Sequence, residues 1–527
     1  MQRVSRLAVL LAAVAAHATA LGGGFVWLDH AHLEQRAALA EPENWVGLFQ
    51  EGFAGTGFYR PLMSLSLSID AALGGTAFLY HATTLGWHAL AALMVTIAAE
   101  ALGLSRKAAL IAGLLFAVHP VTSLVASAIA FRSEAMALVA LLSLVTFHVK
   151  RKPLLAMLAI VAGGLCKETV VALAPLVVLL LELIKKSQTL SPRMGQRTLF
   201  AEVMGVTIVL LLRHLYAPDW RARAPDLSLS EAFGTRTASL FKSAATLLPM
   251  GFQDRTVCDA FEVASVTQVT ALAGAVVALG VVYLVRQKPL VGGLLALALL
   301  PSLQIVPVMR WWSPHYLYIP LAFLAMLVGE LVLNSLRRPV VWALLGTALF
   351  AAQTLQENLR FRSDATLWGR EVRIDPRCRE GAFYLGEAER TRRNWDAAAT
   401  HFEAAIRTTP HVLSFVDLKA AHANLGVVRL EQRRPAEAQE EFRSALARVS
   451  DENEKRRLLH NLATALLLSG DAAGTVQILA QEVQRDDALP EALMLQLRAL
   501  LKLGRLEETQ PLSSRLKAST PPPKGVK

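Results

Sequence analysis

The sequence predicts an all-α protein that consists of a polytopic helical membrane bundle followed by a soluble helical repeat domain. Two observations carry this prediction. Of the 527 residues, 54% are hydrophobic and only 18% are charged, whereas soluble domains average about a quarter charged residues. The apolar excess is confined to residues 1–356, and residues 357–518 have the composition of ordinary soluble helices. We therefore expect a membrane domain over 1–356, a repeat domain over 357–518 and a disordered tail over 519–527.

Eleven apolar segments are candidates for membrane spans, because a bilayer core of about 30 Å needs about 20 apolar helical residues. The fourth and fifth segments are short, and they could form a tight hairpin inside the bundle. The eleven predicted spans are 6–26, 80–103, 108–128, 134–149, 153–166, 169–184, 198–217, 266–285, 289–308, 315–335 and 339–356.

The basic residues predict the orientation of the bundle. Fifteen of them lie on alternate connections that contain no acidic residue. Basic loops stay in the cytoplasm, so we expect a cytoplasmic N-terminus and, after an odd number of spans, an external repeat domain. The chain has 53 basic and 42 acidic residues, a net charge of +11, and these fifteen explain the excess without a nucleic-acid partner. They are Arg3, Arg6, Arg106, Lys107, Lys150, Arg151, Lys152, Lys185, Lys186, Arg193, Arg197, Arg286, Lys288, Arg337 and Arg338.

The N-terminus has a second interpretation. Residues 1–20 carry two arginines, an apolar run and Ala-His-Ala-Thr-Ala, and this pattern also fits a cleaved signal peptide. The apolar run continues to Val26, which favours an uncleaved span, and cleavage would leave the later orientation unchanged. Cys258 and Cys378 fall outside the membrane, where an oxidising compartment permits a disulfide, although the sequence does not decide whether they pair. The 39 arginines against 14 lysines suggest a bacterial inner membrane, with the repeats in the periplasm.

The soluble part contains a repeated pattern. Leu385-Gly386 is followed by Ala398, Phe402 and Ala405, and Leu425-Gly426 is followed by Ala438, Phe442 and Ala445 at the same offsets. This grid is the tetratricopeptide pattern of paired helices, in which small residues permit close approach and phenylalanine fills the gap. Residues 456–487 and 490–517 resemble two degenerate further units. We expect the array to bind a polypeptide on its concave face.

Ionisable residues at the outer ends of the predicted spans are the candidates for chemistry, because charges at membrane depth are costly. A structural alternative exists for several of them: Arg132 with Glu134, and Lys167 with Glu168, are also common as helix-end charges. Trp311, Trp312, Tyr316 and Tyr318 are typical of an interfacial aromatic belt. His30, His32 and Glu34 lack the spacing of a metal site, so we expect no metal there. The candidates are Asp29, His30, Arg60, His119, Arg132, Glu134, Lys167, Glu168, His315 and Tyr316.

An ordered set of short motifs resembles a known family. They occur in the order of the transmembrane and tetratricopeptide repeat-containing O-mannosyltransferase-like family, within the C-type glycosyltransferases. The motifs are Phe25-Val26-Trp27-Leu28-Asp29-His30, Tyr59-Arg60-Pro61-Leu62, Tyr80-His81, Trp87-His88-Ala89, Leu115-Phe116-Ala117-Val118-His119-Pro120-Val121, Arg132-Ser133-Glu134, Cys166-Lys167-Glu168, Leu300-Pro301, Ile305-Val306-Pro307, Tyr316-Leu317-Tyr318-Ile319-Pro320 and Arg362-Ser363-Asp364-Ala365-Thr366-Leu367-Trp368.

The resemblance implies an enzyme that transfers a sugar, typically mannose, from a polyprenyl-phosphate donor to a serine or threonine hydroxyl outside the membrane. Asp29 is then the expected general base. Arg60, Arg132, Lys167 and His315 are expected at the donor phosphate, where cations stabilise the leaving group. His30, His119, Glu134, Glu168 and Tyr316 are expected to support them. The expected partners are membrane lipid and an acceptor polypeptide or partner protein on the repeats.

Three positions depart from the family pattern. Leu28 replaces the first of two adjacent acids, Leu124 replaces a glutamate, and Pro314-His315 replaces Glu-Arg. These departures suggest an alternative of another class, a catalytically inactive membrane-anchored repeat scaffold for protein–protein interaction. A third hypothesis keeps the enzyme and changes the acceptor to a glycan or a lipid.

Overall fold

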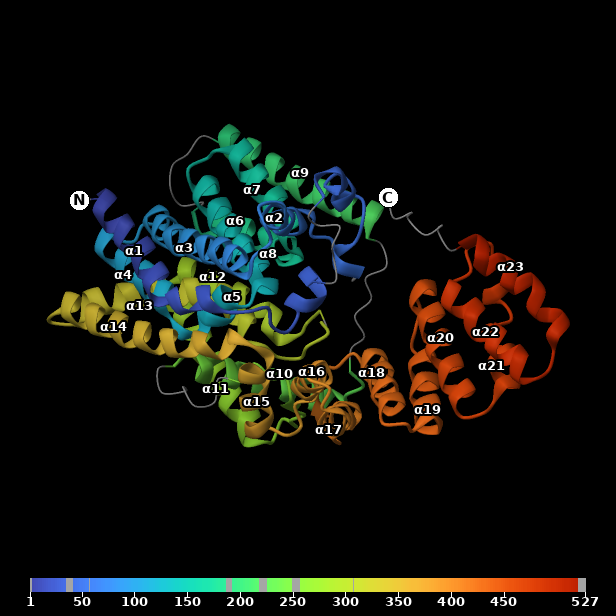
Figure 1. Cartoon of the computed structure of the whole chain (residues 1–527). Coiled ribbons are helices and arrows are strands. Elements are labelled where there is room, and N and C mark those ends of the chain that lie inside the picture. Colours follow the sequence, from blue (N-terminus) through green and yellow to red (C-terminus); the bar gives the residue numbers. More distant parts are fainter. Residues whose placement is uncertain are drawn as a thin grey trace. The chain divides into compact units, whose positions relative to one another are not determined.

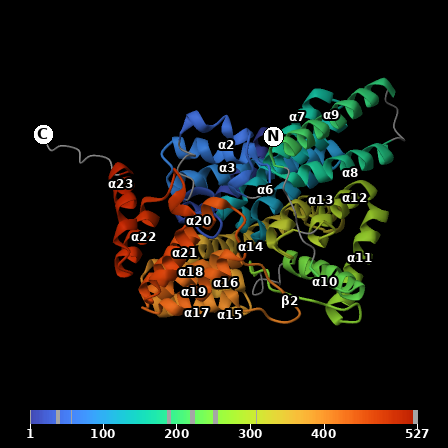
Figure 2. The same cartoon turned by 90° about the vertical axis from the view of Figure 1, so that its right-hand side faces the viewer.

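The structure is a computed structural model that describes residues 2–34, 41–55, 57–185, 192–217, 225–248, 256–306 and 308–519. Over these residues the chain is all-α except for one two-stranded sheet. The chain divides into two compact units, residues 1–367 with 411–413 and residues 368–410 with 414–527 (Figures 1 and 2). Lys186, Pro307 and the predicted tail beyond Ser519 lie outside the described residues.

The first unit is a bundle of helices. In its core, α3 packs against α4 and α6, α13 packs against α4, and α7 packs against α6 and α9 (Figure 1). The short strands β1 (Phe261–Glu262) and β2 (Val412–Leu413) pair antiparallel. The helices are α1 (Gln2–Ala16), α2 (Pro61–Ala72), α3 (Ala77–Leu102), α4 (Arg106–Val118), α5 (Ser123–Ser127), α6 (Arg132–Val149), α7 (Pro153–Cys166), α8 (Glu168–Lys185), α9 (Pro192–Tyr216), α10 (Leu229–Leu247), α11 (Val269–Gln287), α12 (Pro289–Leu299), α13 (Tyr318–Ser335) and α14 (Pro339–Asn358).

Local sequence explains where these helices begin and end. Proline occupies the first turn of α2, α7, α12 and α14, where its missing N–H removes no helical hydrogen bond. The hydroxyl of Thr76 accepts a hydrogen bond from the N–H of Leu79 and caps the start of α3. Gly103 ends α3 with a φ of 102°, a left-handed conformation that glycine adopts without strain.

The apolar helices make this a candidate multi-pass membrane protein. Within the described residues, six helical segments are long and apolar enough to cross a membrane, or seven if the bent pair α4–α5 is one span. Four of the eleven predicted spans coincide with other helices. These four helices do not meet the same criterion of length and apolar composition. The helices α1, α7 and α12 are too short, and α8 carries three charged residues, Glu168, Glu182 and Lys185.

Three predicted spans are not the continuous helices that we expected. In the span 289–308, α12 ends at Leu299, a 3₁₀ turn runs from Leu300 to Leu303, and Gln304 has a left-handed φ of 52°. The span 6–26 was predicted as one helix, but α1 ends at Ala16 and a 3₁₀ turn, Ala18–Gly22, follows. The span 108–128 bends by 50° at His119-Pro120, between α4 and the short helical turns that follow it. Proline cannot donate the hydrogen bond that would continue α4, so the imidazole of His119 caps a new turn instead.

The second unit is a series of helices in which each helix contacts the next. A Cβ atom on Gly386 would lie 2.8 Å from the ring of Phe402, and one on Gly426 would lie 2.6 Å from the ring of Phe442. The two glycines therefore permit the close approach that the sequence pattern predicts. The helices are α16 (Arg379–Thr391), α17 (Trp395–Ile406), α18 (Leu418–Glu431), α19 (Pro435–Leu446), α20 (Glu452–Leu468), α21 (Ala472–Leu479), α22 (Pro490–Lys502) and α23 (Thr509–Ser519).

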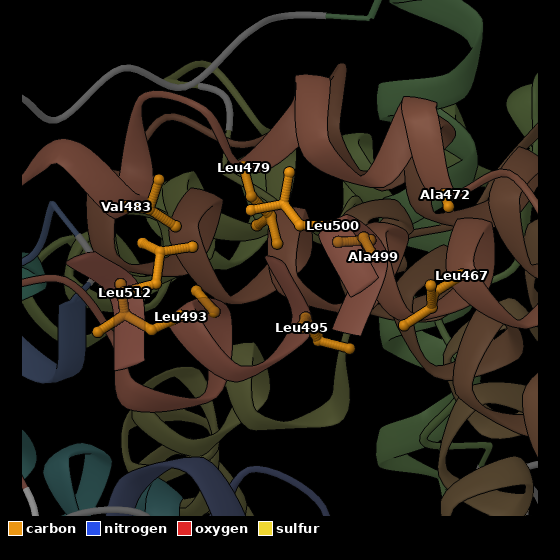
Figure 3. Packing of buried hydrophobic residues seen from close by; sticks show 11 residues of the cluster. Leu467, Ala472, Leu479, Val483, Leu493, Leu495, Ala499, Leu500 and Leu512 are labelled. Carbon is orange, nitrogen blue, oxygen red and sulfur yellow. The ribbon is translucent and has the colours of Figure 1, made fainter. Parts of the chain in front are cut away.

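The last helices of this unit share one apolar core. Leu479, Leu493 and Leu500 are almost fully buried at its centre, where side chains of α20 to α23 meet (Figure 3). The helix α15 (Asp364–Ile374) begins in the first unit and continues into the second. Cys258 and Cys378 are both disulfide-bonded, and Cys166 is a free, buried thiol.

Candidate functional site

A cluster of charged side chains forms where several helices begin. Arg60 directly precedes α2, Glu134 lies in the first turn of α6, Lys167 and Glu168 join α7 to α8, and His315 lies in the turn before α13. Lys167 forms an ion pair with Glu134, and Nε2 of His315 lies 3.7 Å from the same carboxylate. Arg60 binds Glu168 through two hydrogen bonds, of 2.9 Å from Nε and 2.5 Å from Nη2. These five residues are the polar cluster.

The cations of the polar cluster retain unused hydrogen-bond donors. Among the described residues, Nη1 of Arg60 has no hydrogen-bond partner, and the Lys167 ammonium, which has three N–H donors, binds one carboxylate. His315 uses Nδ1, which lies 2.7 Å from the hydroxyl of Ser313, and Nε2 makes no hydrogen bond in this part of the chain. Two cations, Arg60 and Lys167, and the ring nitrogen Nε2 of His315 can therefore still bind an anion.

Aromatic rings connect the polar cluster to the segment that contains Asp29. The ring of Phe131 lies 4.7 Å from that of His315 and 4.8 Å from that of Trp27. The guanidinium of Arg310 stacks 5.2 Å from the Trp27 ring and, like Lys167 and Arg60, is close enough to act on His315 electrostatically. Arg310 thus adds a further cation beside the polar cluster, and the predicted set did not include it.

Asp29 is fully buried beside the start of α6. One carboxylate oxygen accepts a 2.7 Å hydrogen bond from the N–H of Ala130, and the other accepts a 3.2 Å bond from the N–H of Val26. Burial raises the pKa of Asp29 from 3.8 to about 7, although these backbone hydrogen bonds favour its charged form. A carboxyl group with this pKa can gain and lose a proton near neutral pH, which general base catalysis requires.

The backbone next to Asp29 is strained. Trp27 is fully buried and has a φ of 57°, a left-handed conformation that is rare for a bulky residue. Such strain costs about 1–3 kcal/mol, and it concentrates at functional sites because the surrounding structure must enforce it. The N–H of Trp27 donates a 2.8 Å hydrogen bond to the carboxylate of Asp364, which holds this conformation.

His30 links the same segment to two carboxylates. Its Nε2 lies 2.6 Å from Asp364, and its Nδ1 lies 2.5 Å from Glu34. Hydrogen bonds to Asp364, and then to Glu34, raise the pKa of His30 from 6.5 to about 9 against the opposing effect of burial. His30 is therefore charged at neutral pH, and it supports the segment as an ion-pair partner.

Arg132 lies inside the bundle, away from solvent. We expected it at the donor phosphate, but its guanidinium makes four hydrogen bonds to protein groups and an ion pair with Asp70. Its guanidinium is fully buried and pairs with Asp70 at 2.6 Å, and its remaining hydrogen bonds reach Ser66, Thr84 and Tyr80. These partners belong to α2 and α3, so Arg132 joins α2, α3 and α6.

Other predicted residues also have structural partners. His119 accepts a hydrogen bond from the N–H of Val121 and lies 3.2 Å from the carbonyl of Leu247, so both ring nitrogens are engaged. The Tyr316 hydroxyl donates to the carbonyl of Arg310, and the Tyr316 ring contacts His315 at 4.3 Å. Tyr316 therefore supports the polar cluster, whereas His119 caps a turn.

The expected aromatic belt is partly a packed core. Trp311 and Trp312 are buried, and their indole N–H groups donate to the hydroxyls of Ser239 and Ser243 in α10. These polar partners permit burial of both rings inside the protein. Tyr318 is also fully buried, and its hydroxyl lies 2.8 Å from Nδ1 of His88.

Sequence reasoning missed two carboxylates that act in this region. Asp70 neutralises Arg132, and Asp364 holds Trp27 and His30. Asp70 lies in the apolar stretch between Met63 and Leu73, where a lone acid is itself a signal of a buried cation. Within the described ranges, no group of three or more His, Cys, Asp or Glu side chains has the arrangement of a metal site.

No model of a protein family matches this chain, and no curated protein is similar to it.

Proposed function

We propose that this protein is a membrane glycosyltransferase that moves a sugar, mannose in our hypothesis, from a polyprenyl-phosphate donor to serine or threonine hydroxyls of a polypeptide. The observation that carries the proposal is the polar cluster, in which cations with unused donors lie at helix starts and are connected through Phe131 to the segment of Asp29. The ordered motifs that resemble the O-mannosyltransferase-like family support the same conclusion.

The proposed topology has eleven spans. Seven long apolar spans, with the bent pair α4–α5 counted as one, supply this number together with α1, α7, α8 and α12. The fifteen basic residues on alternate connections favour a cytoplasmic N-terminus and an external repeat domain. The disulfide-bonded state of Cys258 and Cys378 supports an oxidising compartment such as the bacterial periplasm.

The polar cluster suits a phosphate group. It lies at the starts of α2, α6, α8 and α13, where helix dipoles favour negative charge. In the proposed reaction, Nη1 of Arg60, the Lys167 ammonium and Nε2 of His315 bind the donor phosphate. They stabilise the negative charge that remains on polyprenyl phosphate when its bond to the sugar breaks.

Asp29 is the proposed base of the same reaction. It accepts the proton of the acceptor hydroxyl while the hydroxyl oxygen attacks the anomeric carbon from the side opposite the phosphate, which inverts the configuration. Because Asp29 is fully buried, the acceptor must displace the groups that cover the carboxylate. The second unit supports the binding of a polypeptide acceptor, since its paired helices and glycine–phenylalanine contacts suit a tetratricopeptide-type array.

Transfer from a labelled donor tests the proposal. Full-length protein in liposomes is incubated with radiolabelled polyprenyl-phosphate mannose and Ser/Thr-rich peptides, and sugar on peptide is counted. Lys167→Met leaves the buried Glu134 without its cation, so binding is measured on the folded fraction, which we expect to bind the donor about 10- to 100-fold more weakly through the loss of charge-assisted hydrogen bonds. Asp29→Asn should lower kcat about 10²- to 10⁴-fold. Lys288→Met and Asp396→Asn are matched controls, because both residues lie outside the site and have their own partners.

One observation favours a second candidate, the membrane-anchored repeat scaffold. Both oxygens of Asp29 accept backbone hydrogen bonds and the residue is fully buried, as expected of a structural carboxylate. If the parent protein neither binds nor cleaves the donor, while crosslinking in native membranes captures a partner equally with the parent and with Asp29→Asn, the scaffold replaces the enzyme.

A further inference from the structure

The segment from Gly23 to His30, which carries Asp29, is held by hydrogen bonds from several elements. His81 of α3 lies 3.2 Å from the carbonyl of Gly24, and Ala130 donates to Asp29. The third attachment comes from the start of α15, more than 300 residues later in the chain. There the carbonyl of Arg362 accepts a 3.1 Å hydrogen bond from the N–H of Gly24.

Asp364 makes the central contacts of this third attachment. Its Oδ1 accepts the N–H of Trp27 at 2.8 Å, and its Oδ2 lies 2.6 Å from Nε2 of His30. One carboxylate therefore binds the residues on both sides of Leu28-Asp29. Within the segment, Trp27 is the one residue with a left-handed φ, and Asp364 accepts the hydrogen bond of its backbone N–H.

The position of Asp364 is itself fixed. It is the first residue of α15, where a carboxylate is favoured by the helix dipole. The preceding residue, Ser363, exchanges hydrogen bonds with Thr366: each hydroxyl accepts the N–H of the other residue, at 3.1 and 3.3 Å. This reciprocal cap sets the start of the helix and thereby the direction of the Asp364 side chain.

We propose that Asp364 is a positioning residue that enforces the strained conformation of Trp27 and thereby holds Asp29 in place for proton transfer. The role of Asp364 in proton transfer rests on the proposed function. Its role in holding the conformation of Trp27 does not. Asp364 touches neither donor nor acceptor, and it acts through the Trp27 backbone and the His30 ring. Oδ1 is the essential contact, because it accepts the N–H of the strained residue itself.

A cysteine probe tests the structural part without any assay of activity. Val26 is fully buried and lies next to Trp27, and Val26→Cys introduces a small apolar thiol, the probe thiol, while leaving Asp29 unchanged. Native Cys166 is a buried free thiol, so it reports general loosening of the bundle in the same molecule. Labelling of each thiol in the full-length protein by a membrane-impermeant maleimide is followed by peptide mass spectrometry.

Three substitutions are compared in the Val26→Cys background. Asp364→Ala removes both contacts and should raise the labelling rate of the probe thiol about tenfold or more, while Cys166 stays unreactive. Asp364→Asn keeps an oxygen for the Trp27 N–H and should leave labelling within about twofold of the parent. Glu34→Gln, the matched control, changes the other carboxylate partner of His30 and should leave labelling unchanged.

The outcomes separate this inference from the proposed function. If the probe thiol stays protected in Asp364→Ala, or if Asp364→Asn is as reactive as Asp364→Ala, the positioning role is wrong whatever the activity. Equal labelling of the probe thiol and Cys166 indicates a general structural role and also overturns it. If the probe thiol responds as expected and the parent transfers no sugar, the positioning role stands and the enzyme proposal fails.

In an active protein, Asp364→Ala should lower kcat at least tenfold with donor KM nearly unchanged. Asp364→Asn should keep most of the parent's kcat.

Discussion

Arg132 and Arg60 are both arginines at helix starts near the candidate site, yet the structure predicts opposite consequences for their loss. Arg132→Met removes the cation that neutralises Asp70, whose side chain is 3% exposed. Breaking a buried ion pair from one side costs about 3–5 kcal/mol, because the remaining charge is left without a partner. Arg60→Met leaves Glu168 with 28% of its side chain exposed, where solvent can compensate, and should cost about 1 kcal/mol.

The comparison is measured by thermal unfolding of full-length protein in detergent. For Arg132→Met we expect a fall in midpoint of about 5–10 °C, and for Arg60→Met a fall of about 2 °C. The double variant Arg132→Met/Asp70→Leu removes both charges, and it should recover most of the lost stability because apolar residues of similar volume can replace a buried pair.

For donor binding we expect the opposite contrast: the loss of Arg60 should weaken it, and the loss of Arg132 should not. Folded Arg60→Met should bind polyprenyl-phosphate mannose more weakly, whereas the folded fraction of Arg132→Met/Asp70→Leu should bind it like the parent. The reasoning is refuted if Arg132→Met unfolds at the parent temperature, or if the double variant is no more stable than the single one.

Three further predictions concern titration and packing. Since the pKa of Asp29 is raised to about 7 by burial, kcat/KM should rise with pH and reach a plateau above 7, with about a tenth of the plateau at pH 6; a flat profile for the parent excludes Asp29 as the base. The pKa of His30 is raised to about 9, mainly by Asp364, so its contribution to stability is complete below pH 6.5 and is lost as pH rises through 9; unfolding midpoints between pH 6 and 10 should show this loss in the parent and not in His30→Gln. Gly386→Ala places a Cβ 2.8 Å from Phe402 and should destabilise the second unit by about 1–3 kcal/mol, whereas Gly369→Ala, with no atom within 4 Å of its Cβ, should not; equal effects in calorimetry contradict the close-approach argument.

The sequence predicted the helices better than their interruptions. Apolar length located α3, α6 and α13 within a few residues, because a long apolar run has few alternatives to a helix. The breaks at Ala16 and at His119-Pro120 were missed, since apolar composition continues through both. At the second break, Pro120 was the available signal, because a proline inside an apolar run ends or kinks a helix.

The site residues were found more readily than their roles. Motif order led to Arg60, Glu134, Lys167, Glu168 and His315, which the structure brings together. It also selected Arg132, because sequence cannot distinguish an arginine that binds a ligand from one that is satisfied inside the protein. That distinction depends on partners such as Asp70, which lies 62 positions away and meets Arg132 only after α2, α3 and α6 have packed.

Arg132 is neutralised by side chains of other helices, and this also constrains the order in which the helices enter a membrane. Transfer of a lone guanidinium from water to the middle of the bilayer costs about 2.5–3.5 kcal/mol, and transfer to a position near a helix end costs less. The carboxylate and hydroxyls that neutralise it belong to α2 and α3, which are synthesised earlier. We therefore expect α6 to leave the insertion machinery only after those helices are already beside it. Biogenesis of the bundle is in this sense ordered from the N-terminus, and a truncated chain that lacks residues 61–102 should release α6 poorly.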